Sequence, residues 1–254
     1  MSNMYPEYEG KTINFITGGC PHGCLYCYVK SFRFPLLKKR YSGKQKLDEA
    51  AFKKNLGKNN LWFVCSCNDI NTIDIKWEVR ILNHLRDSYP DNTYLIQSKY
   101  PPRFSVIDDS EFPPNTILGI TAETDKDYDL SKAPQPADRL IDFTYLDTKF
   151  PKMISIEPIM DFDLVRFVEL IRRVHPSYVS IGADSKSHNL TEPDADKTKE
   201  LISELKAFTE VRIKPNMKRL IGDNIIERND EYTCTCYDKP RRVLKWKFWE
   251  VTFQ

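Results

Sequence analysis

The chain has 254 residues, a formal net charge of +2 at pH 7 and 41% hydrophobic residues. This length allows one large α/β domain, and the near-neutral charge excludes a protein that binds nucleic acid through its overall charge alone. No window approaches the roughly 18 consecutive apolar residues that would span a bilayer. The first ten residues also lack the charged-then-apolar pattern of a signal peptide. We therefore expect a cytoplasmic protein with no membrane partner.

Short β-branched and aromatic runs alternate along the chain with segments of helical pattern. The runs are mostly apolar rather than alternating, which is typical of strands covered on both faces. Seven strands are predicted, the last of them the weakest: Thr12–Thr17, Leu61–Ser66, Thr93–Ser98, Thr116–Thr121, Met153–Glu157, Tyr178–Ala183 and Val211–Lys214.

Apolar residues recur at helical spacing between these strands. They do so from Ile73 to Leu85 and again in Leu164–Val174, which Asp161 and Asp163 precede as start signals. A third helix is expected to start after an N-cap at Thr191 and to reach about Phe208.

Strand–helix alternation with long crossovers predicts a parallel sheet. The expected fold class is α/β, a partial (β/α)6-type, TIM-like barrel of parallel strands over residues 1–214. From residue 215 to 254 the alternation stops and cations and aromatics become frequent, so we expect a C-terminal extension that packs on the barrel. In such folds the functional site lies at the carboxyl ends of the strands.

Three of the seven cysteines lie in the loop after the first strand, at Cys20, Cys24 and Cys27. The odd total and the clustering argue against a disulfide framework. Three thiolates from one loop can ligate three irons of a [4Fe–4S] cluster, which leaves the fourth iron open to an external ligand. The alternative is a three-cysteine zinc site completed by His22.

This C-x3-C-x2-C loop resembles the signature of the radical S-adenosylmethionine (SAM) superfamily. Tyr26 stands where that family has an aromatic residue near the adenine. The resemblance implies a [4Fe–4S] cluster and SAM as cofactors. It also implies an enzyme that cleaves SAM reductively to a 5′-deoxyadenosyl radical, which abstracts hydrogen from a substrate. An electron donor such as flavodoxin or ferredoxin is then the expected partner.

The rest of the barrel resembles spore photoproduct lyase and related small phage-associated radical SAM proteins. The likeness rests on short motifs at the expected strand ends: Phe63–Asp69, Gln97–Lys99, Gly119–Glu123, Ser155–Pro158 and Ser180–Ala183.

The same resemblance implies a role for each matching residue. Ser66, with Asn68 as the alternative, would contact the SAM amino group, and Lys99 would pair with the SAM carboxylate. Thr121 or Glu123 would reach the ribose. For Glu123 the competing interpretation is a solvated loop carboxylate.

The other four cysteines form two Cys-x-Cys pairs, Cys65 with Cys67 and Cys234 with Cys236. On one strand Cys65 and Cys67 would point to the same side, so all four could make a second site for zinc or another cluster. The resemblance offers a catalytic role instead, because the lyase has a cysteine near this strand end that returns a hydrogen atom to the substrate radical. A buried apolar cysteine is the third interpretation.

Basic residues cluster at Lys38–Arg40, and cations alternate with aromatics in the extension, for example around Trp246. Such patterns suit phosphates and unstacked bases, although a solvated face explains them as well. Spore photoproduct lyase acts on a base flipped out of DNA. The resemblance therefore implies modification or repair of a nucleic-acid base or nucleotide. Glu157 and Asp184 stand at strand ends where substrate groups would be held, and the alternative for either is a loop anchor. The alternatives are a peptide or small metabolite as substrate, or a non-catalytic iron–sulfur or zinc-binding nucleic-acid-binding protein.

Overall fold

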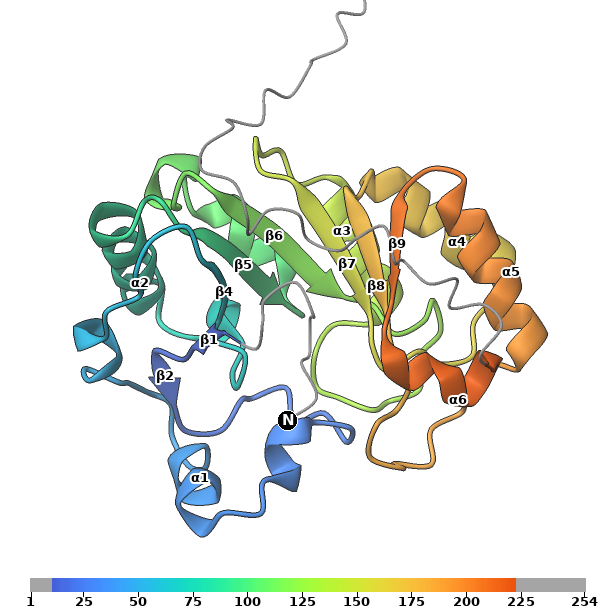
Figure 1. Cartoon of the computed structure of the whole chain (residues 1–254), viewed down its shortest axis with the longest axis horizontal. Coiled ribbons are helices and arrows are strands. Elements are labelled where there is room, and N and C mark those ends of the chain that lie inside the picture. The colour runs from blue at the N-terminus through green and yellow to red at the C-terminus, as the bar shows by residue number, and fades with distance from the viewer. Residues whose placement is uncertain (1–10, 223–254) are drawn as a thin grey trace, which may run out of the picture.

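The computed structural model describes residues 11–222 of the chain. Seven strands form a single sheet in the order β1-β4-β5-β6-β7-β8-β9, and every neighbouring pair is parallel (Figure 1). Their bounds are β1 Thr12–Ile13, β4 Leu61–Val64, β5 Thr93–Ser98, β6 Thr116–Thr121, β7 Lys152–Ile156, β8 Tyr178–Ile181 and β9 Glu210–Ile213. The predicted α/β class with a parallel, partial barrel is confirmed, and within residues 11–222 the sheet does not close between β1 and β9.

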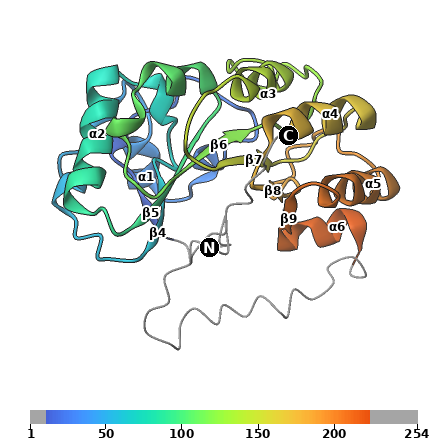
Figure 2. The same cartoon turned by 90° about the horizontal axis from the view of Figure 1, so that it is seen from above.

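Four helices cover the outer face of the sheet. They are α2 (Ile75–Ser88), α3 (Pro136–Thr144), α4 (Leu164–Val174) and α5 (Ala195–Lys206), and they lie in an arc when the molecule is seen from above (Figure 2). Between β5 and β6 the crossover consists of two 3₁₀ segments, Pro101–Val106 and Asp109–Glu111.

Aspartates begin three of these helices. Of the two aspartates that precede α4, Asp163 caps the helix, because its Oδ1 accepts a hydrogen bond from the amide of Arg166 at 2.9 Å. The expected cap at Thr191 is wrong. Asp194 instead accepts from the amide of Lys197 at 2.8 Å, so α5 starts three residues later. A short carboxylate in this position both satisfies a free amide and complements the helix dipole.

The first predicted strand is divided in two. Only β1 joins the main sheet, while β2 (Ile16–Thr17) pairs antiparallel with β3 (Lys46–Leu47). Asn14 lies at the break, where its Oδ1 accepts a hydrogen bond from the amide of Cys67 at 2.9 Å. We call residues 16–17 and 28–47, which flank the cysteine loop of residues 18–27, the N-terminal lobe. The lobe includes a 3₁₀ turn (Tyr28–Ser31) and the short helix α1 (Pro35–Arg40), which lies at the bottom of Figure 1.

Both faces of the sheet are buried. One large apolar cluster joins the helices to the sheet, with Leu82 of α2 and Phe167 of α4 fully enclosed. A smaller cluster of Phe63, Leu95 and Met153 with Tyr178 covers part of the other face. This two-sided burial explains why the strands are continuously apolar in sequence.

The structure describes only the first residues of the expected extension. Pro215–Met217 forms a 3₁₀ turn and Lys218–Ile221 the short helix α6. Met217 and Ile221 are buried in the main apolar cluster. Residues 223–254, including Cys234 and Cys236, lie outside the described residues. Among the helices of residues 11–222, none is both long and apolar enough to cross a membrane.

A buried carboxyl group on α2 lies close to the sheet. Glu78 is 1% exposed, and its Oε2 has no hydrogen-bond partner within the described residues. Burial raises the pKa of Glu78 from 4.5 to about 8, with Arg103 acting against this rise and Asp69 adding to it. Folding therefore takes up a proton between these two pKa values, so stability falls as the pH rises through that window.

Replacing this residue isosterically, Glu78→Gln, should remove that pH dependence. We expect the variant to be more stable than wild type at about pH 9 and to lose this advantage at about pH 3, because the wild-type carboxyl is protonated in both the folded and the unfolded state there. Urea unfolding at both pH values measures the difference. The exposed Glu200→Gln is the matched control. An equal gain at both pH values would mean that packing, and not ionisation, causes the change.

Candidate cofactor site

The cysteine loop is anchored to the N-terminal lobe by backbone contacts. The amide of Gly18 donates to the carbonyl of Arg40 at 2.8 Å, and that of Gly19 to the carbonyl of Gly43 at 2.9 Å. Gly18 has a φ of +89°, and a Cβ atom there would lie 2.4 Å from the backbone oxygen of Lys44. Only glycine fits this close approach, so the residue fixes the point at which the loop leaves the lobe.

The three loop cysteines are all free thiols. Cys24 is buried, whereas Cys20 and Cys27 are partly exposed. Burial raises the pKa of Cys20 to about 12, and Asp69 and the other two loop thiols add to this rise. The pKa of Cys27 is also raised, mainly by burial and in part by Cys24. The three thiols therefore lie close enough for the charge of one thiolate to raise the pKa of the others. In this buried position the thiolate forms require a bound cation to compensate their negative charge.

This donor set fits an iron–sulfur cluster. Within residues 11–222 no group of three or more His, Cys, Asp or Glu side chains is arranged to hold a single metal ion. A cubane takes one thiolate on each of three different irons, so its ligands need not converge on one point. Soft thiolates with no hard oxygen ligand among them also suit iron–sulfur chemistry.

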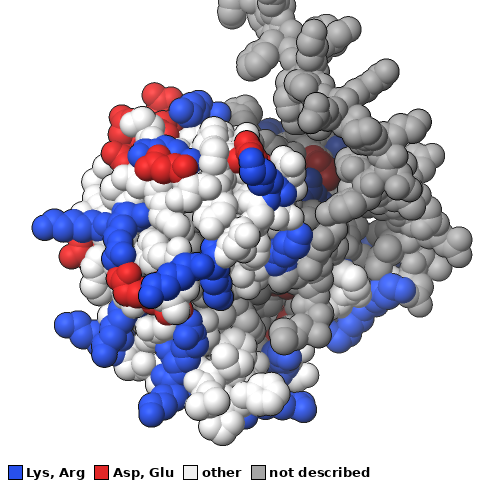
Figure 3. Space-filling model, turned by 60° about the vertical axis from the view of Figure 1, so that its left-hand side comes forward, with Lys and Arg blue, Asp and Glu red and all other residues white. Residues whose placement is uncertain are grey.

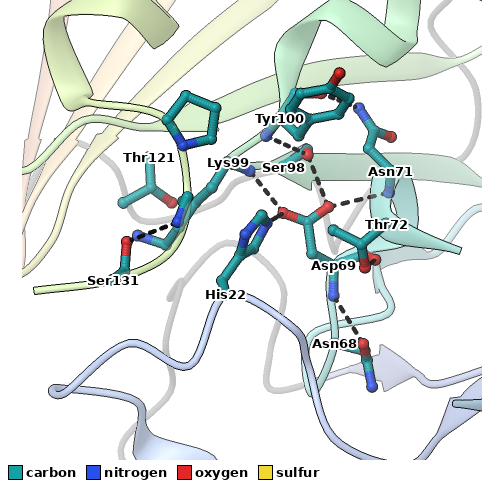
Figure 4. Close-up of polar contacts among 12 residues, drawn as sticks. His22, Asn68, Asp69, Asn71, Thr72, Ser98, Lys99, Tyr100, Thr121 and Ser131 are labelled. Carbon is teal, nitrogen blue, oxygen red and sulfur yellow. Dashed lines mark hydrogen bonds and ion pairs between the residues drawn. The ribbon is translucent and has the colours of Figure 1, made fainter. Parts of the chain in front are cut away.

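His22 ties the cysteine loop to the ends of β4 and β5. Its Nε2 lies 2.8 Å from Oδ2 of the buried Asp69. Asp69 also accepts hydrogen bonds from the Ser98 hydroxyl and the Lys99 amide, each at 2.7 Å, and from the Asn71 amide at 3.0 Å (Figure 4). Although burial opposes ionisation, the His22 contact and these hydrogen bonds hold the pKa of Asp69 below its ordinary value. His22 thus anchors the loop to the ends of these two strands.

Four side chains form a charged cluster beside the cysteine loop. Glu123 is 2% exposed and binds Lys99 through Oε1, while the Arg139 guanidinium lies 2.9 Å from Oε2. The Tyr26 hydroxyl donates to Oε1 of Glu123 and accepts from Nζ of Lys99 at 2.9 Å. Burial opposes ionisation of Glu123, but Arg139 and Lys99 hold its pKa well below the ordinary value. The solvated-carboxylate interpretation of Glu123 is therefore wrong.

This cluster has a surplus of one positive charge, because two cations surround a single carboxylate. The Lys99 side chain retains 15% exposure. A pocket bordered by Tyr26, Glu123 and Arg139 opens next to it, with the 126–131 loop as its other wall. The site therefore suits a ligand that carries a carboxylate.

The other expected cofactor contacts have structural partners within the protein. Asn68 donates to the carbonyl of Gly18 at 3.0 Å and accepts from Gln45 at 2.6 Å, so it holds the cysteine loop. The Ser66 hydroxyl is 3.4 Å from Oδ1 of Asn14. Thr121 accepts a hydrogen bond from Gln97 at 2.7 Å. All three lie at the carboxyl edge of the sheet, where they were expected.

Cys65 and Cys67 do not share one side of a strand, contrary to expectation. β4 ends at Val64, Cys65 has a φ of +57°, and the amide of Asn68 closes a turn onto the Cys65 carbonyl at 2.9 Å. The Cys65 side chain is buried in the core, where burial raises its pKa to about 12. Cys67 is partly exposed, and its Sγ lies 3.5 Å from the hydroxyl of Tyr28. The two thiols therefore occupy different environments.

The two residues expected to hold substrate are engaged in loop contacts. Glu157 binds Lys214 across Gly182, where a Cβ atom would lie 2.9 Å from Oε1 of Glu157. Asp184 accepts a hydrogen bond from the amide of His188, and its Oδ1 lies 2.7 Å from Nδ1 of the same histidine. Both residues stand at the carboxyl edge and organise the loops that border it.

Sequence reasoning missed Arg139 and Tyr28, and it gave Asp69 no role. Asp69 closes the Phe63–Asp69 motif, so its position after a strand was the available signal. Tyr28 follows the third loop cysteine directly. Arg139 lies in α3, and nothing in the sequence distinguishes this 2% exposed arginine from a surface one.

The fold and the site together define a class: an open parallel α/β barrel with a three-cysteine loop over the carboxyl ends of its strands. The sequence matches no protein-family model and no curated protein. Among solved structures, a cysteine-to-serine variant of spore photoproduct lyase matches with a TM-score of 0.55 and 12% identity, over 84% of this chain and 78% of that one. A tyrosine-to-phenylalanine variant and a cysteine-to-alanine variant match with TM-scores of 0.51 and 0.52, both at 10% identity, over 78% of this chain and 74% of theirs. The expected likeness to spore photoproduct lyase is thus confirmed in the fold.

Proposed function

We propose that this protein is a radical SAM enzyme that acts on a nucleic-acid base or nucleotide. One observation carries the proposal: a C-x3-C-x2-C loop overhangs the carboxyl edge of a fold shared with spore photoproduct lyase, directly beside a buried cluster with surplus positive charge. A bound [4Fe–4S] cluster and SAM would supply reductive cleavage of SAM to a 5′-deoxyadenosyl radical.

Cys20, Cys24 and Cys27 would hold the cluster in this proposal. Lys99 would hold the SAM carboxylate, since its ammonium is kept at the site by Glu123 and Tyr26 and is still partly exposed. Arg139 neutralises the remaining charge of Glu123, which leaves Lys99 free to pair with a second carboxylate. Asp69 would keep the cysteine loop and the Lys99 backbone in register.

Cys67 is the better candidate for returning a hydrogen atom to substrate. It is partly exposed and close to the Tyr28 hydroxyl, whereas Cys65 is enclosed in the apolar core. The role of Cys65 and Cys67 in a second metal site with Cys234 and Cys236 stays a prediction. Cys65 is enclosed in the core and Cys67 is partly exposed. The two thiols are therefore less suited to bind one metal together than two thiols on the same face of a strand.

The Cys67→Ala variant tests this assignment. We expect it to keep SAM cleavage, because Cys67 is not a loop ligand, and to lose transfer of solvent-derived hydrogen to product. Reactions in heavy water followed by mass spectrometry measure that transfer, since a thiol exchanges its proton with solvent. Cys65→Ala is the matched control and should retain transfer. Full deuterium transfer in Cys67→Ala would contradict the assignment.

The substrate class is tested with the iron-loaded full chain, SAM and dithionite. Single-stranded DNA, duplex DNA, RNA, free nucleotides and peptides are supplied in parallel. The proposal predicts a SAM-dependent mass change in a nucleic acid or nucleotide and increased 5′-deoxyadenosine in its presence. A response to peptides alone would move the substrate to that class. Iron or zinc binding with no SAM cleavage at all would indicate a non-catalytic protein.

A further inference from the structure

The N-terminal lobe carries a concentrated positive charge. Residues 11–47, which contain the lobe and β1 before it, include eight lysines and arginines and no acidic residue, out of 38 and 36 in the whole chain. The remainder of the chain thus has 30 cationic residues against 36 acidic ones. The net charge of +2 therefore hides a strongly basic segment attached to a mildly acidic barrel.

Most of this charge is not neutralised by side chains in the described part of the chain. Arg40 pairs with Asp48, and Lys30 donates to the carbonyls of Gly23 and Cys24 at 2.7 Å each. None of the ion pairs found among residues 11–222 involves the other exposed cations of the lobe, which are Arg33, Lys38, Lys39, Lys44 and Lys46. In the lower part of the face in Figure 3, the level at which α1 lies in Figure 1, blue Lys and Arg side chains far exceed red Asp and Glu.

Apolar side chains lie among these cations. Phe34 is 69% exposed and Leu36 is 82% exposed, immediately before Lys38 and Lys39. Phe34 offers one ring on which a base could stack, but the more exposed Leu36 is aliphatic and does not stack, so the pair suits an apolar protein contact better than a run of bases. An apolar centre with a charged rim is the usual composition of a protein interface.

The same lobe is joined directly to the cysteine loop. Gly18 and Gly19 bind the backbone at the end of α1, and Lys30 binds the carbonyl of Cys24. A protein seated on α1 would therefore lie against the segment that carries the three loop cysteines. Positive charge at this place attracts an acidic partner and raises its association rate.

We propose that the basic lobe surface, defined by Arg33, Phe34, Leu36, Lys38 and Lys39, is the docking site of a small acidic electron-transfer protein of the flavodoxin type. The inference rests on the proposed function, because it assigns a partner to the cysteine-held cluster. One electron leaves the reduced flavin of the donor and enters the cluster, and no bond forms or breaks. Weak, electrostatically guided encounters of this kind need only a small interface.

The charge-reversal variant Lys38→Glu/Lys39→Glu tests the proposal in the iron-loaded full chain. Reduction of the chain by reduced flavodoxin is followed in a stopped-flow spectrometer, with dithionite as the small-molecule reductant. We expect the rate with flavodoxin to fall about tenfold or more at low salt, and the wild-type rate to fall as ionic strength rises. The rate with dithionite should not change. The control is Lys199→Glu/Lys206→Glu on α5, far from α1 in Figure 1, which should keep the wild-type rates.

An unchanged rate with flavodoxin in Lys38→Glu/Lys39→Glu would overturn the proposal. If this variant kept the wild-type rate with flavodoxin but lost binding of a fluorescent oligonucleotide, the proposal would also be overturned, and the surface would be assigned to nucleic acid instead. Equal losses in both double variants would indicate an effect of overall charge and would also overturn it. SAM cleavage driven by dithionite does not depend on docking, so the proposed function can stand while this inference fails. If wild type assembles no cluster, binding of oxidised flavodoxin to the two variants still decides whether the surface docks it.

Discussion

Replacing Cys24 by alanine should abolish assembly of the iron–sulfur cluster while leaving the barrel folded. Wild type should take up about four irons per chain, and the variant close to none, because a cubane that loses one of its three protein ligands has two open irons instead of one. The fold should survive because Cys24 belongs to a loop held by the Gly18 and Gly19 backbone contacts and not to the apolar core.

Iron content after anaerobic reconstitution and the far-ultraviolet circular dichroism of both proteins measure these effects. Cys65→Ala is the matched control, since it removes a cysteine that lies in the core and outside the loop. That variant should keep its iron. Full iron content and full SAM cleavage in Cys24→Ala would show that the loop cysteines do not hold the cluster.

Neutralising the buried carboxylate, Glu123→Gln, should destabilise the fold severely. The change leaves Lys99 and Arg139 without their shared anion, and the Arg139 side chain is only 2% exposed. Removing one partner of a buried ion pair costs about 3–5 kcal/mol because an uncompensated buried charge remains. Equilibrium unfolding in urea at neutral pH measures this loss, with Glu204→Gln on the exposed side of α5 as the control, which should change stability by less than about 0.5 kcal/mol.

The pH dependence gives an independent check on the same residue. The pKa of Glu123 is depressed in the folded protein. The ionised carboxylate therefore contributes fully to the free energy of unfolding above the ordinary glutamate pKa of about 4.3, and this contribution is lost as the pH falls below that value. The stability difference between wild type and Glu123→Gln should therefore shrink in acid. A small difference at neutral pH, or one that grows in acid, would contradict an ionised Glu123 between two cations.

Local patterns predicted those parts of the fold that depend on nearby residues. The helix Leu164–Val174 was predicted at its observed bounds, because its apolar repeat and the aspartate that caps it lie next to each other in the sequence. The carboxyl edge of the sheet was located correctly for the same reason, since each polar motif follows its own apolar strand. The cysteine spacing predicted the position of the loop, but it did not predict the contacts that hold the loop in place.

The remaining features depend on contacts between distant residues. The sequence pattern of Thr12–Thr17 predicts one strand. In the structure the segment divides, because β2 pairs with β3 about 30 residues later in the chain and strand propensity does not determine such pairing. The left-handed backbone at Cys65 ends β4 early and separates two cysteines that an extended strand would have aligned. The anchoring of His22 by Asp69 and the pairing of Glu123 with Arg139 join separate βα units, and no spacing rule within one segment reveals them.

We expect the loop of Cys20, Cys24 and Cys27 to support reductive cleavage of SAM. The yield of 5′-deoxyadenosine from the anaerobically reconstituted full chain with SAM and dithionite measures this activity. About four irons per chain should be bound, and 5′-deoxyadenosine should form only when both SAM and reductant are present. A chain that binds only zinc, or one that assembles the cluster and forms no 5′-deoxyadenosine under strong reduction, would contradict this expectation.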